Sequence, residues 1–313
     1  MMVGGFLPHS LNKLILVTMC RCCILLNLAA IFLMFVSMKQ ESVKLLLAGS
    51  GWNKIVIIDK STKEIEWEHR LEQGWECNSV NYTPEGNVLF SYKKGAKLIT
   101  KNHEEIWDIK APSGCEMQSA SVLPGGNFLL AWAGNPAVIM EVDKAGNIIR
   151  KTEYNTGIER AHAQFRQVSK NDKGNYFVPV MKYKEVHEIS PEGKLIRKYA
   201  VEGNPFTVLE DKDNIYWIAC GDGHVLMKKD LKSDETILKY GKDDIKGTRL
   251  FFVAGMAKSE RGGIYICNWQ GHDKNAVLSE SPQVLELDKE GNIIWSLNDN
   301  EKFGKISAID IIK

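Results

Sequence analysis

Polar and ionisable side chains stand directly before, or at the start of, short apolar segments of the chain. The members of this set carry carboxylate, amide, imidazole or guanidinium groups: Glu76, Asn78, Glu116, Gln118, His162, Gln164 and Arg166. A guanidinium can hold a carboxylate or a sulfate through paired, charge-assisted hydrogen bonds. The set therefore predicts a site for a small polar ligand. The competing interpretation is a structural ion pair between Arg166 and Glu76 or Glu116.

A second group of candidate residues lies in glycine-containing loops between apolar segments. Residues 220–224 read Cys-Gly-Asp-Gly-His and residues 268–272 read Asn-Trp-Gln-Gly-His, so that these loops present His224, Trp269 and His272. Other loops of this kind carry further tryptophans, whose rings suit stacking on a sugar: Trp52, Trp75 and Trp132. These loops predict binding of a small polar ligand, a glycan or a protein.

Metal binding by the same residues is a second possibility. Three imidazoles can hold Zn²⁺, and they would be those of His162, His224 and His272, although nothing in their spacing shows that they converge. Oxygen ligands of the kind that Ca²⁺ prefers are offered by Glu76, Asn78, Glu116 and Asp222. We therefore predict no cofactor and leave Ca²⁺ or Zn²⁺ open.

The apolar segments repeat along the chain. Their first strands are expected to begin at Ser79, Ser119, Phe165, Phe206, Ala254 and Ile306, at intervals of 40 to 52 residues. After each of the first five comes a turn rich in Gly, Pro, Asp, Asn or Lys, followed by further strands. Four short antiparallel strands in 40 to 50 residues are the unit of a β-propeller blade. The sequence predicts an all-β fold, a six-bladed β-propeller over residues 41–313.

The two ends of the chain supply complementary parts of one blade. Residues 306–312 read as a first strand with no successors, whereas residues 43–48, 54–59 and 64–69 read as second, third and fourth strands with no first. We expect the C-terminal and N-terminal strands to pair and close the ring, which removes exposed sheet edges. Loops before the innermost strands then share a face with the second-to-third strand loops, so the candidate residues should meet at one mouth of the central channel.

Residues 1–40 differ from the rest of the chain. Lys13 and Arg21 precede a fifteen-residue apolar run, residues 22–36, that only Asn27 interrupts. A basic flank before a short apolar stretch is typical of a secretory signal, and the run is short for a membrane span. We expect a signal peptide or an N-terminal anchor, and hence an exported protein in the periplasm or at the cell surface. A true start at Met19 is an alternative.

Charge and composition narrow the range of partners. The chain of 313 residues has a formal net charge of +1 and no block of Lys or Arg, so nothing favours nucleic acid as a partner. Four cysteines follow residue 40 at no metal-ligand spacing, which is typical of small buried residues. We expect a monomer that contacts a membrane only through its N-terminal segment.

The fourth-strand motif resembles the repeat of PQQ-like propellers. Segments 58–67, 142–149 and 287–295 each place an Asp before a turn, and the first and last end on Trp67 and Trp295. More narrowly, segments 74–79, 121–126 and 202–206 are similar to propeller proteins of Bacteroidetes described as surface-layer-like or PQQ-like. The resemblance covers residues 43–313 and implies outer-strand tryptophans that pack between blades.

The resemblance does not imply the PQQ cofactor. PQQ-dependent dehydrogenases have eight blades and a vicinal cysteine pair, whereas this chain has six repeats and its only Cys-Cys is Cys22-Cys23, inside the expected signal. We expect an exported binding or interaction protein. The alternative is a metal-assisted hydrolase or lyase that uses the same face, although the chain contains no Gly-x-Ser-x-Gly or His-Glu-x-x-His motif. A scaffold without a ligand is a third possibility.

Overall fold

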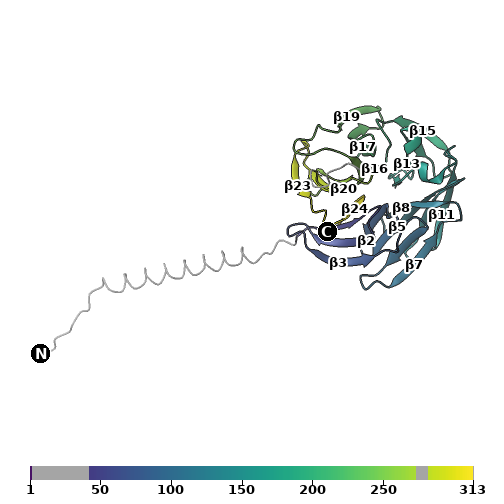
Figure 1. Ribbon diagram of the computed structural model, residues 1–313. Helices are drawn as coiled ribbons and strands as arrows, with labels where there is room; N and C mark the ends of the chain where they lie inside the picture. Colours follow the sequence, from purple (N-terminus) through teal and green to yellow (C-terminus); the bar gives the residue numbers. More distant parts are fainter. Residues whose placement is uncertain (2–41, 273–280, 313) are drawn as a thin grey trace. The chain divides into compact units, whose positions relative to one another are not determined.

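The computed structural model describes residue 1, residues 42–272 and residues 281–312. The compact unit Val43–Lys313 consists of six four-stranded antiparallel sheets arranged in a ring (Figure 1). It is a six-bladed β-propeller, and the predicted fold class is confirmed.

Within each blade, four strands follow one another from the innermost position to the outermost. Blade 1 contains, in this order, β24 (Ala308–Ile312), β1 (Lys44–Ala48), β2 (Lys54–Asp59) and β3 (Ile65–Arg70). Blade 2 contains β4 (Ser79–Tyr82), β5 (Val88–Tyr92), β6 (Gly95–Ile99) and β7 (Glu105–Lys110). Blade 3 contains β8 (Glu116–Val122), β9 (Phe128–Ala133), β10 (Ala137–Val142) and β11 (Ile148–Tyr154).

The remaining three blades follow the same order. Blade 4 contains β12 (Ser169–Lys170), β13 (Tyr176–Val180), β14 (Glu185–Ile189) and β15 (Leu195–Ala200). Blade 5 contains β16 (Thr207–Lys212), β17 (Ile215–Cys220), β18 (Val225–Asp230) and β19 (Glu235–Tyr240). Blade 6 contains β20 (Phe252–Lys258), β21 (Ile264–Trp269), β22 (Val284–Leu287) and β23 (Ile293–Leu297). Two single-turn 3₁₀ helices lie on either side of β12 and β13 in the sequence, η1 (Ala161–Ala163) before β12 and η2 (Met181–Tyr183) after β13.

The repeated Asp-x-x-Gly-Asn segments form the hairpin turns between third and fourth strands. In blade 3, Asp143 Oδ1 accepts hydrogen bonds from the backbone N–H groups of Ala145 and Asn147 at 2.9 and 2.8 Å. Gly146 has φ of 85°, in the left-handed region that glycine adopts without strain. The turn at residues 288–292 repeats this pattern. The motif is therefore explained by the geometry of the turn.

The two ends of the chain close the ring as predicted. Strand β24 pairs antiparallel with β1, with Ala308 opposite Ala48 and Ile312 opposite Lys44. The innermost strand of blade 1 thus comes from the end of the chain and its other three strands come from the beginning (Figure 1). This confirms the closure that the split repeat indicated.

Outer strands are tied to the next blade by one side-chain donor each. Every acceptor is a backbone carbonyl in the connection between the third and fourth strands of that next blade. The pairs are Trp67 with Lys101 (2.8 Å), Trp107 with Lys144 (3.3 Å), Thr152 with Pro191 (2.6 Å), Arg197 with Leu231 and Lys232 (3.3 and 3.2 Å), Tyr240 with Glu290 (3.0 Å) and Trp295 with Lys60 (3.0 Å). The outer tryptophans therefore pack between blades, as the repeat implies.

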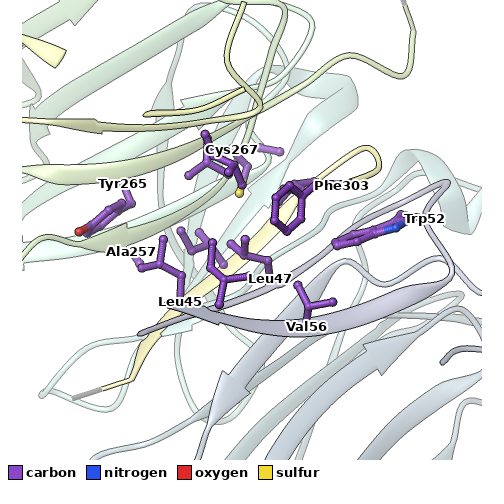
Figure 2. Close-up of a cluster of buried hydrophobic side chains, with 14 of the residues drawn as sticks. Leu45, Leu47, Trp52, Val56, Ala257, Tyr265, Cys267 and Phe303 are labelled. Carbon is purple, nitrogen blue, oxygen red and sulfur yellow. The ribbon is translucent and has the colours of Figure 1, made fainter. Parts of the chain in front are cut away.

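Each interface between blades also buries an apolar cluster. Figure 2 shows the cluster between blades 6 and 1, where Leu45 and Leu47 of β1 face Cys267 of β21. Trp52 belongs to this core, is 9% exposed and meets the Phe303 ring edge-on at 6.3 Å between centroids. The expectation that Trp52 could stack on a sugar is therefore wrong, because its faces are covered by protein. Trp132, which is 8% exposed, cannot stack on a sugar for the same reason.

Blade 4 departs from the sequence prediction at its innermost strand. That strand was expected to begin at Phe165, with Arg166 inside it, whereas β12 begins at Ser169 and Arg166 lies in the loop between η1 and β12. The Gln164 side chain binds the backbone of Gly134 and Ile158, and this holds the loop away from a regular strand. Arg166 therefore lies in the loop that precedes β12.

The prediction for residues 1–40 falls outside the described residues, apart from Met1. In the part of the chain that the structure describes, no helix is long and apolar enough to span a membrane. Three of the four cysteines in the propeller, Cys77, Cys220 and Cys267, are buried free thiols, and Cys115 is half-buried.

Candidate functional site

A cavity of about 110 Å³ lies at one mouth of the central channel. Its walls come from the loops before the innermost strands and from second-to-third strand loops of five blades. The lining residues are Ser50, Glu76, Asn78, His162, Arg166, Phe206, Phe252, Trp269, His272 and Ser307. We call this space the central cavity. Six of the ten candidate residues line it: Glu76, Asn78, His162, Arg166, Trp269 and His272.

Arg166 is the only residue of this lining that is cationic at any ordinary pH. It is 7% exposed, and Nη1 donates hydrogen bonds to the carbonyl oxygens of His162 and Phe165 at 2.8 and 3.0 Å. Nη2 donates to His162 Nε2 at 3.0 Å. Among the described residues no carboxylate lies within 4.0 Å of the guanidinium, so the structural ion pair with Glu76 or Glu116 does not form.

Burial without an ion pair is costly for a charged group. Burial lowers the pKa of Arg166 to about 10, although the negative charges of Glu76 and Glu116 act in the opposite direction. The guanidinium still carries its charge at neutral pH. Its Nε–H and one N–H of Nη2 have no partner in the described part of the chain, and adjacent donors of this kind are the ones that hold a carboxylate.

His162 is held between Arg166 and Glu116. Its Nδ1–H donates to Glu116 Oε2 at 2.8 Å, while Nε2 accepts from Arg166. Because a guanidinium can only donate, these two contacts require the neutral imidazole with its proton on Nδ1. Glu116 therefore orients the His162 ring, and the ring in turn orients the Arg166 guanidinium. Both ring nitrogens have protein partners, so neither is free to bind a metal ion.

Glu116 is the centre of a polar network that joins blades 2, 3 and 4. It accepts from Gln118 Nε2 at 3.0 Å, and Lys93 Nζ lies 3.3 Å from its other oxygen. Gln118 Oε1 in turn accepts from Asn78 Nδ2 at 2.9 Å. Burial alone would raise the pKa of Glu116, but the contacts with His162 and Lys93 outweigh this effect and leave the pKa below its ordinary value.

Glu76 reaches the same cavity from the loop before β4. Its side chain is half-buried, and it has no hydrogen-bond or ion-pair partner in the described part of the chain. Of the nearby carboxylates, Glu76 has the largest electrostatic effect on the pKa of Arg166, yet it lies beyond ion-pair distance from the guanidinium. The central cavity therefore has a positive and a negative side, and neither is neutralised by a direct contact.

Gln164 does not belong to the cavity lining. It is fully buried, its oxygen accepts from Gly134 N–H at 3.0 Å, and its nitrogen donates to the carbonyls of Gly134 and Ile158 at 2.9 and 2.7 Å. Both of its N–H donors are used and the side chain is covered by protein, so it offers nothing to a ligand. The sequence pattern could not separate Gln164 from His162, because both precede the same strand.

Two wider hollows adjoin the central cavity on the same face. One, of about 290 Å³, contains His224 and shares Phe252, Trp269 and His272 with the central cavity. The other, of about 500 Å³, contains Lys93 and Glu116 and shares Glu76 and His162. The candidate residues from the second-to-third strand loops therefore lie on the same face as His162 and Arg166.

A family model described as "Mala_s_1-like: Mal s 1 allergenic protein-like" matches residues 50–292, which contain most of the propeller. The chain belongs to the Mal s 1 allergenic protein-like family. Among solved structures, a protein of unknown function from Bacteroides caccae is 51% identical to this family member, with a TM-score of 0.84; the match covers 87% of this chain and 100% of that one. The comparison with curated proteins gives no match.

More distant structures share the fold alone. A catalytically inactive virginiamycin B lyase from Staphylococcus aureus, solved with quinupristin, is 12% identical with a TM-score of 0.56 over 84% of this chain and 87% of that one. A streptogramin B lyase is 14% identical with a TM-score of 0.58 over 86% and 90%. The comparisons support a six-bladed propeller of the kind found in Bacteroides, and they do not confirm the PQQ-like or surface-layer-like description.

The three imidazoles of this Mal s 1-like chain are engaged separately. His162 binds Glu116, His272 Nδ1 donates to Asp222 Oδ1 at 2.8 Å, and His224 Nδ1 contacts the carbonyl of Phe251. Among the described residues, no group of three or more His, Cys, Asp or Glu side chains is placed to hold a metal ion. The predicted convergence of imidazoles on Zn²⁺, or of carboxylates on Ca²⁺, is not seen in this part of the chain.

Sequence reasoning missed four residues of the cavity lining. Phe206 and Phe252 form an apolar wall, with ring centroids 5.5 Å apart and planes at 88°, while Ser50 and Ser307 form the side contributed by blade 1. The signal was present for Phe206 and Phe252, since each immediately precedes or begins an innermost strand as the polar candidates do. Because both side chains are apolar, the sequence pattern indicated core residues at these positions.

Proposed function

We propose that this protein is an exported binding protein whose central cavity takes the anionic group of a small polar ligand. The observation that carries the proposal is Arg166, a buried guanidinium without an ion pair that lines an open cavity. A ligand carboxylate would compensate the buried charge and use the remaining donors. Of the ligands that the sequence predicted, the proposal retains a small polar ligand and a glycan that carries a carboxylate.

The charge of the lining favours a single negative charge on the ligand. Arg166 is the one fixed cation of the lining, His162 is neutral, and Glu76 lies in the same wall. A dianionic phosphate would face Glu76 with only one guanidinium to balance it. A carboxylate fits this balance better.

Two further parts of the proposal rest on the sequence. Export is supported by the basic and then apolar pattern of residues 13–36. The metal-assisted hydrolase or lyase has no comparable support, because among the described residues the imidazoles have separate partners and no metal-ligand group forms. The lyase activity of the distant propellers is theirs, and likeness of fold is weak support for a shared function.

The proposal is tested by titration calorimetry of the full chain with L-lactate, D-glucuronate and neutral D-glucose. We expect the carboxylates to bind and D-glucose not to, and we expect Arg166→Gln to weaken carboxylate binding at least about ten-fold, as for loss of a charge-assisted pair. Arg197→Gln, the same change on the outer strand β15, is the matched control and should leave binding unchanged.

Two results would overturn the proposal. One is equal affinity of D-glucose and the carboxylates, or no carboxylate binding at millimolar concentration. The other is unchanged carboxylate binding by Arg166→Gln.

The stability of Arg166→Gln should stay within about 1 kcal/mol of the parent, because loss of three hydrogen bonds is offset by relief of a buried charge.

A further inference from the structure

The central cavity offers an unpaired anion as well as an unpaired cation. Glu76 and Arg166 both line it, both lack an ion-pair partner among the described residues, and they do not reach each other. A buried charge without a partner is costly, so a nearby opposite charge of the same protein would be expected to pair with it. Their separation across a cavity leaves room for a ligand that carries both complementary charges.

From this arrangement we infer that the ligand is a small zwitterion of the α-amino acid class. Its carboxylate binds the free donors of Arg166 and its ammonium donates to Glu76, while its side chain lies against the Phe206–Phe252 wall. The inference rests on the proposed function, because it requires the anion site at Arg166, and it adds the ammonium site and the class of ligand.

The size of the cavity sets an expectation for the side chain. About 110 Å³ is less than the roughly 150 Å³ of an apolar cavity that accepts benzene. A short side chain such as that of alanine fits within this volume. A longer one must extend into the adjoining hollow that contains Trp269 and His272, which shares three residues with the central cavity.

The lining explains why the ammonium would select Glu76. Glu116 already accepts hydrogen bonds from His162 and Gln118 and pairs with Lys93, so its charge is compensated. Asp222 lies in the neighbouring hollow and accepts from His272. Glu76 is therefore the carboxylate of this lining that is free to accept from a ligand.

The test compares L-alanine with L-lactate, which replaces the ammonium by a hydroxyl at the same position, and with L-alaninamide, which removes the carboxylate. Calorimetric titration of the full chain should show that L-alanine binds at least ten-fold more tightly than either analogue. Glu76→Gln should reduce L-alanine affinity at least ten-fold and leave L-lactate affinity unchanged or higher. Glu72→Gln, in the same loop but exposed, is the matched control and should change neither.

The outcomes separate this inference from the proposed function. Equal binding of L-lactate and L-alanine, both weakened by Arg166→Gln, would overturn the zwitterion and leave the anion site standing. Unchanged L-alanine binding by Glu76→Gln would likewise overturn the role of Glu76. Failure of every carboxylate to bind would overturn both proposals.

Discussion

At the scale of single residues, the loop face shows how one carboxylate organises several neighbours. Glu116 accepts from His162 and Gln118 and pairs with Lys93, and through His162 it orients Arg166. Removing it would free the imidazole that contacts Nη2 of Arg166, while Nη1 would keep its two backbone carbonyls. Glu116 is thus a positioning residue for the cavity, whereas Arg166 and Glu76 are the groups that would touch a ligand.

The lowered pKa of Glu116 makes its contribution dependent on pH. A carboxyl whose pKa is lower in the folded chain than in the unfolded chain stabilises the fold above its unfolded pKa, and this contribution is lost as the pH falls through the folded pKa. Glu116→Gln should therefore be about 1 to 3 kcal/mol less stable than the parent at pH 7. Urea unfolding should show the difference shrinking as the pH falls from about 5 to 3. A difference that stays constant over this range would contradict the assignment.

At the scale of elements, the outer strands hold the blades together through a repeated contact made by different residues. Tryptophan serves in blades 1, 2 and 6, while threonine, arginine and tyrosine serve in blades 3, 4 and 5. The acceptor is always a turn carbonyl that would otherwise lack a protein partner. The repeat is therefore more regular in its contacts than in its sequence.

Trp295→Phe tests this contact at the junction of blades 6 and 1. The change keeps an aromatic ring but removes the N–H that donates to Lys60 O, and we expect a loss of about 1 kcal/mol in the free energy of unfolding. Trp75→Phe is the control, because the Trp75 ring stacks on Tyr92 at 3.9 Å and its N–H has no partner among the described residues. Equal losses in the two variants would show that the hydrogen bond contributes nothing.

At the scale of the whole molecule, the ring depends on a strand at the very end of the chain. Strand β24 supplies the innermost position of blade 1, and its residues Ala308 and Ile309 are buried in the clusters on either side of that blade. A propeller that lacks this strand exposes the edge of β1 and opens both interfaces. Closure therefore connects the last residues of the chain to the stability of every blade.

Deletion of residues 305–313 should cause aggregation or loss of cooperative unfolding, because the exposed edge of β1 offers unpaired backbone groups to other chains. Differential scanning calorimetry and analytical ultracentrifugation measure these two effects. A truncated protein that remains monomeric and melts at the temperature of the parent would show that closure is unnecessary.

The sequence alone was sufficient for the fold, because each blade carries its own local signals. Turn residues such as Gly146, alternating apolar strands and the split repeat at the chain ends are short-range features, and six copies reinforce one another. The same reasoning placed His162, Arg166 and His272 on one face, since blade topology fixes which loops and strand ends share a face, although it put Arg166 inside the innermost strand and not in the loop before it.

Only the tertiary structure decided which of these side chains face the cavity. Gln164 and Arg166 are two positions apart. The Gln164 side chain is hydrogen-bonded to backbone groups of Gly134 and Ile158, whereas Arg166 lines the cavity and has donors available for a ligand. Trp52 lies in the loop between β1 and β2, and Trp269 ends β21 at the equivalent position of blade 6, yet the first is core and the second lines the cavity. These differences depend on contacts between distant blades, and no local pattern in the sequence records such contacts.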